Sequence, residues 1–135
     1  MSLAFIFIAA AAVLGSLGGL HLFYTFRGNK LHPRDPAVRD AMEHSNLVIT
    51  RQTTVWRANQ GFNATHGLGI VAFSLVYGYL ALQRPEVLRN APFLMGLGMA
   101  ILLAYLVLAR RYFFSTPFRG VALACVMYGI GWMLA

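Results

Sequence analysis

WRANQGFNATHGLGIVAFSLVYGYLAL, residues 56–82, decides the fold, because it joins a polar stretch to an apolar run long enough to complete a membrane span. Successive residues of a helix are about 100° apart, so the polar side chains of this stretch gather on one face. That face carries Trp56, Asn59, Gln60, Asn63, His66, Gly67 and Ser74. Polar groups at membrane depth are costly unless they face protein, water or each other. The stretch therefore predicts a helix whose polar face looks into the protein.

The composition of the whole chain indicates an integral membrane protein. Of the 135 residues, 59% are hydrophobic and only 11% are charged, whereas about 25% are charged in ordinary globular chains. The net charge of +7 would suit nucleic-acid binding in a soluble protein. Here the basic residues lie between apolar segments, where membrane orientation and contact with anionic lipids explain them better. We therefore expect membrane lipids as partners and no nucleic acid.

Four apolar segments predict membrane-spanning helices at about residues 3–26, 58–83, 92–109 and 117–134. The connections between them are short, so we expect an all-α, up-and-down four-helix bundle built as a single transmembrane domain of residues 1–135. In the first connection, Asp35 before Pro36 predicts the capped start of a juxtamembrane helix that runs on towards Ile49. The pattern leaves open whether the chain stays helical through Thr50–Thr54.

The distribution of Lys and Arg predicts the orientation of these spans. Two connections and their flanks hold nine of the eleven cations: Arg27, Lys30, Arg34, Arg39, Arg51, Arg57, Arg110, Arg111 and Arg119. The connection between the second and third spans holds only Arg84 and Arg89. The positive-inside rule places the cation-rich side in the cytoplasm and both termini outside.

With this orientation, three spans carry polar side chains at one depth, near the cytoplasmic face. His21 and Tyr24 lie near the end of the first span, and Arg119 lies near the start of the fourth. The candidate ligand-binding residues are Trp56, Arg57, Asn59, Gln60, Asn63, His66, His21, Tyr24 and Arg119. This convergence favours a pocket for a lipid, a quinone or another amphipathic ligand, whose charged end Arg57 or Arg119 would hold.

Two other functions stay open. The chain can be an accessory or assembly subunit, because amides and histidines also hydrogen-bond across helices to a partner membrane subunit or a second copy. It can also be a small membrane enzyme with His66 as its general base. The sequence does not decide whether the protein is an enzyme.

Cofactors receive little support from the residue types. The spans contain no HExxH motif, no cysteine pair and no carboxylate, so we expect no metal site. A haem held by His21 and His66 is chemically compatible with two imidazoles on facing helices. All four acidic residues lie in connections, which argues against a proton-coupled transporter.

The stretch TRQTTVWRANQGFNATHGLG, followed by LVYGYLAL, resembles a group of small bacterial membrane proteins with four spans, and LHLFYTF and KLHPRDP add weaker support. The resemblance implies a multi-pass protein of the bacterial inner membrane. It also implies that Trp56, Arg57, Asn63 and His66 are important, but it indicates no reaction. In size and span number the chain is also similar to the membrane-associated eicosanoid and glutathione enzymes. The acidic residue of their second-helix motif is missing here, so their activity is not carried over.

Overall fold

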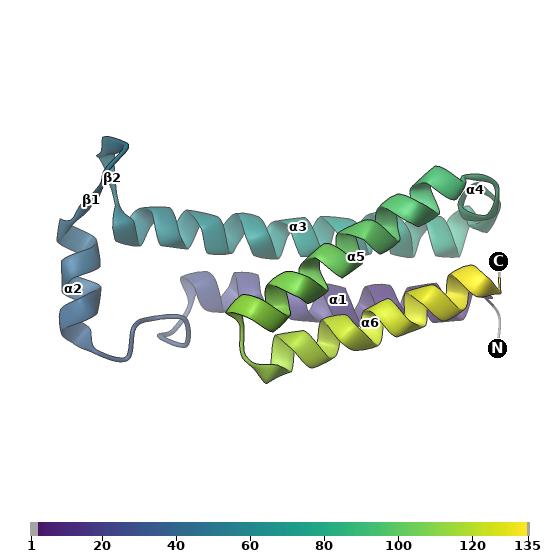
Figure 1. The fold of residues 1–135 in the computed structure, drawn as a ribbon, viewed down its shortest axis with the longest axis horizontal. Helices are drawn as coiled ribbons and strands as arrows, with labels where there is room; N and C mark the ends of the chain where they lie inside the picture. The colour runs from purple at the N-terminus through teal and green to yellow at the C-terminus, as the bar shows by residue number, and fades with distance from the viewer. Residues whose placement is uncertain (1–2, 135) are drawn as a thin grey trace. The chain divides into compact units, whose positions relative to one another are not determined.

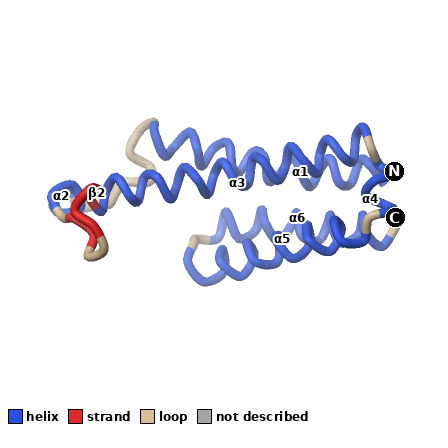
Figure 2. Tube along the Cα trace, turned by 90° about the horizontal axis from the view of Figure 1, so that it is seen from above, coloured by secondary structure: helices blue, strands red, loops and turns tan. Residues whose placement is uncertain are grey.

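A computed structural model describes residues 3–134, most of which are helical (Figure 1). The helices are α1 (Leu3–Phe26), α2 (Pro36–His44), α3 (Val55–Gln83), α4 (Pro85–Asn90), α5 (Pro92–Tyr112) and α6 (Ser115–Met133). The only strands in the described range, β1 (Asn46–Leu47) and β2 (Thr50–Thr54), form a small antiparallel hairpin (Figure 2). The predicted all-α class is confirmed, with this hairpin as a minor addition.

Three of the helices are long and apolar enough to cross a membrane: α1, α3 and α5. Helix α6 covers the fourth predicted span but is not among them within residues 3–134. It has 19 residues, and its first turns contain Pro117 and the charged Arg119, which lower its apolar content. Length and composition therefore indicate a membrane protein with three candidate spans.

The contacts of the chain divide it into two compact units, each described separately below. The helical unit comprises the chain up to Leu17 together with Ile70 onward. The hairpin unit runs from Gly18 to Gly69 and includes α2 and both strands. Helices α1 and α3 contribute residues to both units, so the first and second predicted spans are each divided between them.

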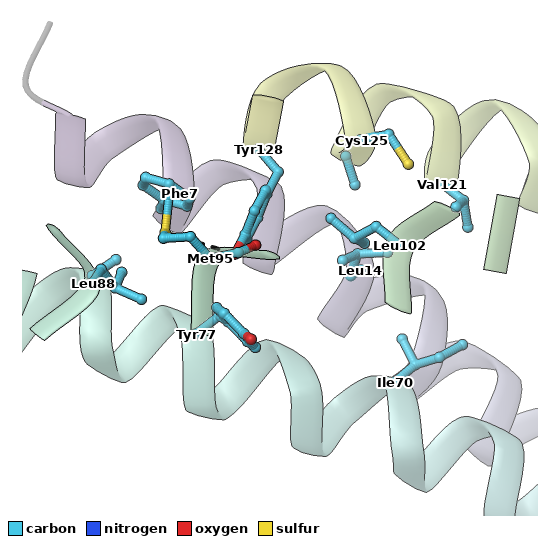
Figure 3. Packing of buried hydrophobic residues seen from close by; sticks show 12 residues of the cluster. Phe7, Leu14, Ile70, Tyr77, Leu88, Met95, Leu102, Val121, Cys125 and Tyr128 are labelled. Atoms are coloured by element: carbon cyan, nitrogen blue, oxygen red, sulfur yellow. Dashed lines mark hydrogen bonds between the residues drawn. The ribbon is translucent and has the colours of Figure 1, made fainter. Parts of the chain in front are cut away.

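The core of the helical unit is apolar and uses all of its helices (Figure 3). The rings of Phe7 and Tyr128 meet edge to face, with their centroids 4.9 Å apart. The Tyr128 hydroxyl donates a hydrogen bond to the Met95 carbonyl at 3.1 Å, and the Tyr77 hydroxyl donates to the Leu94 carbonyl at 2.8 Å. Because both hydroxyls have a partner, these large aromatic side chains can be buried without an unpaired polar group.

In the hairpin unit, the loop between α1 and α2 is fixed at both of its ends. Gly28 has a φ of +78°, the left-handed conformation that lets a chain leave the end of a helix. The His32 N–H then donates to the Asn29 carbonyl at 3.0 Å and closes a turn. The Asp35 carboxylate accepts from the Ala37 N–H at 2.9 Å, which confirms the predicted cap of α2.

The prediction that this helix continues towards Ile49 is wrong. Helix α2 ends at His44, and the chain then enters the hairpin, whose strands pair Asn46 with Thr54 and Leu47 with Thr50. The Val55 N–H closes the hairpin by donating to the Ser45 carbonyl at 2.9 Å. The segment from Val48 to Val55 is rich in β-branched residues, which lose rotamer freedom in a helix and suit strands. Residues 50–54 are therefore a strand, and α3 begins after them.

Candidate functional site

Four polar side chains from α1 and α3 meet in the hairpin unit, and we call them the histidine–asparagine cluster: His21, Asn59, Asn63 and His66. His21 Nε2 lies 3.0 Å from Asn63 Oδ1. The rings of His21 and His66 are in edge-to-face contact, with their centroids 5.1 Å apart. The Asn63 amide nitrogen donates to the Asn59 carbonyl at 2.9 Å and lies 3.3 Å from Asn59 Oδ1. The structure thus brings four of the predicted site residues together.

The hydrogen bonds of the cluster fix the role of several atoms. Because an amide oxygen only accepts, His21 Nε2 must carry a hydrogen and donate it to Asn63. The side-chain nitrogen of Asn59 makes no hydrogen bond with the residues that the structure describes. The side chain of Gln60, the next residue, makes none in the same range either. Both side chains are half-buried, so the cluster keeps polar groups that a ligand can use.

A close approach of the two helices holds the cluster in place. Gly67 directly follows His66 and is buried. A Cβ at this position would lie 3.1 Å from both the Gly18 carbonyl oxygen and the Leu22 backbone nitrogen. Small residues at such a crossing let two backbones pack directly. Backbone packing at Gly67 therefore fixes the position of His66 along α1.

Trp56 lies in a second arrangement, at the start of α3. Its side chain is buried, with the Arg39 guanidinium 3.7 Å from the ring centroid and the His32 ring in edge-to-face contact at 5.0 Å. Arg39 also donates to His32 Nδ1 at 2.9 Å and to the Glu43 carboxylate at 2.8 Å from its Nε. Trp56 therefore holds α2 and the preceding loop to the start of α3. Figure 1 shows α2 and the hairpin at this end of α3.

The remaining predicted site residues lie outside the cluster contacts. The Tyr24 hydroxyl accepts from Lys30 Nζ at 3.3 Å, and the same ammonium group lies 4.5 Å from the centre of the Tyr24 ring. The Arg57 side chain is exposed and makes no hydrogen bond or ion pair with the residues that the structure describes. Arg119 belongs to the helical unit, where its side chain is exposed.

No family model matches the chain. No curated protein and no solved structure shows significant similarity to it.

The cluster does not fit a haem bound by two histidines. Such a haem lies between its two axial ligands, whereas the rings of His21 and His66 contact each other directly. His21 Nε2 is also engaged with Asn63. Across residues 3–134, no group of three or more His, Cys, Asp and Glu side chains is placed to hold a metal ion.

Sequence reasoning missed a pocket in the loop between α1 and α2. It has a volume of about 530 Å³ and is lined by Asn29, Lys30, His32, Pro33, Arg34, Pro36 and Arg39. From the sequence, its cations indicate membrane orientation and contact with anionic lipids, and their spacing does not predict a pocket. The run KLHPRDP was the available signal, because it places basic residues around turn-forming prolines.

Proposed function

We propose that this chain is a bacterial inner-membrane protein that binds a small amphipathic molecule, a quinone or a lipid, at the histidine–asparagine cluster. One observation carries the proposal: the half-buried Asn59 of the cluster and its neighbour Gln60 keep a side-chain nitrogen and a side-chain amide, respectively, that have no partner among the described residues. An amide offers two donors and one acceptor. These groups match the carbonyl or hydroxyl oxygens of an uncharged head group.

The location of the cluster supports binding over simple helix packing. The close approach at Gly67 already brings α1 and α3 together, so the helices do not need so many polar side chains to associate. Polar groups on helices apolar enough to span a membrane are costly and mark functional sites. Leu20, Phe23 and Phe62 on the same two helices are exposed and offer apolar contacts to a ligand tail.

The proposal includes α6 as a fourth span, with the cation-rich connections in the cytoplasm and both termini outside. The nine-to-two distribution of cations supports this orientation. Arg119 lies near the start of α6, where a long side chain can extend to the membrane surface. The resemblance to small bacterial membrane proteins with four spans supports the same arrangement.

Native mass spectrometry of the protein purified in a mild detergent tests the proposal. The wild type should retain a lipid or quinone, and Asn59→Leu and Gln60→Leu should lose it. Gln83→Leu is the matched control, because Gln83 is exposed at the far end of α3. A wild type that carries no such molecule, or equal retention in all three variants, contradicts the proposal.

A second candidate function, an accessory subunit that docks a partner helix, is favoured by a groove on the helical unit. This groove of about 540 Å³ lies between α1 and α3 and is lined by Ile8, Ala11, Ala12, Gly15, Ser16, Val71, Ser74, Leu75, Gly78 and Leu82. Small residues of this kind let another helix approach closely.

Ser16→Leu tests this candidate, because Ser16 is exposed and a leucine there would fill the groove. If a partner helix docks here, the variant should release a co-purified membrane subunit or dissociate a homo-oligomer. Ala104→Leu, an exposed position on α5, should not. An unchanged assembly state in Ser16→Leu would remove the candidate.

A further inference from the structure

The pocket between α1 and α2 has a lining of one charge sign. Three of its seven lining residues are cations, Lys30, Arg34 and Arg39, and no carboxylate lines it. The acidic residues near it along the chain, Asp35, Asp40 and Glu43, have contacts of their own. Asp35 caps α2 through the Ala37 N–H, Asp40 lies 3.4 Å from the His44 ring, and Glu43 pairs with Arg39. The charge of Arg39 is thus largely balanced, so Lys30 and Arg34 are the cations of the lining that have no carboxylate partner among the described residues.

The loop geometry holds the lining residues in position. The left-handed Gly28, the turn from Asn29 to His32 and the cap at Asp35 fix the backbone on both sides of the pocket. Arg39 is held by the Trp56 ring and the Glu43 carboxylate. Contacts within the chain therefore hold the backbone of the pocket and Arg39, while the side chains of Lys30 and Arg34 are exposed.

The lining presents several hydrogen-bond donors that have no partner among residues 3–134. The His32 ring is not one of them, because the Arg39 guanidinium lies 2.9 Å from its Nδ1 and 3.5 Å from its Nε2. Lys30 donates one hydrogen to the Tyr24 hydroxyl and keeps two. The guanidinium of Arg34 and the side-chain amide of Asn29 make no hydrogen bond or ion pair within residues 3–134.

We propose that this pocket binds the phosphate group of a phosphomonoester or phosphodiester. A phosphate needs many donors around several oxygens, and Arg with Lys supplies them as charge-assisted hydrogen bonds. The volume of about 530 Å³ admits a phosphate with an attached organic group. The inference is independent of the amphiphile at the histidine–asparagine cluster, since it uses different residues.

Two sources can supply this group, a phospholipid head group or a soluble phosphate ester. The pocket follows directly after α1, one of the candidate spans, and Phe23 and Phe26 at the end of that helix are exposed. A head group at the membrane surface would reach the pocket from this side. A soluble ester would enter from the aqueous side of the same loop.

Two binding measurements on the full chain test the proposal and separate the sources. Glycerol 3-phosphate is titrated by calorimetry into the detergent-solubilised protein. Retention of dioleoyl phosphatidylglycerol against dioleoyl phosphatidylcholine is measured by native mass spectrometry from nanodiscs that contain both. Both lipids carry a phosphodiester, but the choline cation of the second should be repelled by Lys30 and Arg34. Binding of the soluble probe identifies a soluble ester, and selective retention of the anionic lipid identifies a head group. Failure of both probes overturns the proposal.

Charge-matched variants show whether the binding belongs to the pocket. Arg34→Gln and Lys30→Gln should each weaken binding about tenfold, because each removes a charge-assisted hydrogen bond. Arg51→Gln removes the same charge from an exposed position of the hairpin that does not line the pocket. Its effect should stay below about twofold, as expected for a screened surface charge. Equal weakening by all three variants would mean unspecific attraction to a basic surface and would overturn the proposal.

Discussion

At the scale of single residues, His66 separates the candidate functions. Glutamine approximates the size and hydrogen bonding of a neutral imidazole, so a packing role should survive His66→Gln. Ligand recognition by the imidazole, or general-base catalysis, should not. We expect His66→Gln to keep its thermal unfolding midpoint and to lose ligand retention and cellular function. A variant that folds, is expressed normally and fully complements a deletion strain would contradict a chemical role.

Arg57→Ala is the companion variant on the same helix. Because the Arg57 side chain is exposed and unpaired among the described residues, its removal should change stability by less than about 0.5 kcal/mol. Ligand retention in native mass spectra should also be unchanged. Loss of the ligand in Arg57→Ala would instead support the role that the sequence suggested, a contact with a charged end.

His44 gives a prediction about pH, and it lies in α2, outside the candidate spans. A hydrogen bond between its Nδ1 and the Asp40 backbone carbonyl at 2.9 Å, followed by the nearby Asp40 carboxylate, raises the pKa of His44 above its ordinary value. The protonated ring therefore stabilises the end of α2. This contribution is fully present below about pH 6.5, the value of a free histidine, and is lost as the pH rises through the raised pKa.

An NMR titration of the His44 ring measures this effect. The midpoint should lie above about 6.5, and Asp40→Asn should move it down by removing the carboxylate charge. Hydrogen exchange at the last turn of α2 should quicken as the pH passes the midpoint, after correction for the intrinsic pH dependence. A midpoint at or below the free value would show that the contact with Asp40 does not form.

At the scale of elements, two glycines with different backbones should respond in opposite directions to the same change. Gly28 has a φ of +78°, where a side chain costs roughly 1 to 2 kcal/mol. Gly61 lies inside α3 and has open space around it, so alanine there should stabilise the helix by about 0.5 to 1 kcal/mol. Thermal unfolding should show a lower midpoint for Gly28→Ala and a higher one for Gly61→Ala. A neutral Gly28→Ala would mean that the loop changes its conformation readily.

The elements also show what the sequence can and cannot predict. The long apolar runs and the Asp35-Pro36 pair suffice to place α1, α3 and α5 and the start of α2, because helix periodicity and capping are local effects. The end of α2 cannot be predicted in this way. Its apolar positions continue in helical spacing past His44, while the hairpin depends on a pairing between strands that composition does not specify.

The candidate site, too, can be predicted only in part from the sequence. Helical spacing alone places Asn59, Asn63 and His66 on one face, and span order places His21 at a similar depth. The structure adds the contacts of His21 with Asn63 and His66. The contacts of Trp56 with Arg39 and His32 could not be predicted, because they depend on how a loop folds back onto a helix. The pocket between α1 and α2 could not be predicted for the same reason, although all its cations are present in the sequence.

At the scale of the whole molecule, the number of spans decides the side on which the C-terminus lies. Helices α1, α3 and α5 are long and apolar enough to cross a membrane. The two topologies differ in whether α6 also crosses. Four spans put both termini on the same side, and the nine-to-two distribution of cations predicts that this side is external. Three spans would leave the C-terminus in the cytoplasm, on the same side as Arg110 and Arg111.

Reporter fusions in a bacterial host separate these two topologies. A reporter active only in the cytoplasm should be silent when fused after Ala135 and active when inserted between Arg111 and Ser115. Insertion beside Arg89, in the cation-poor connection, should also be silent and serves as the external control. Activity after Ala135 together with silence beside Arg89 would show that α6 does not cross. A full inversion of the protein would instead make the position beside Arg89 active and silence the position between α5 and α6.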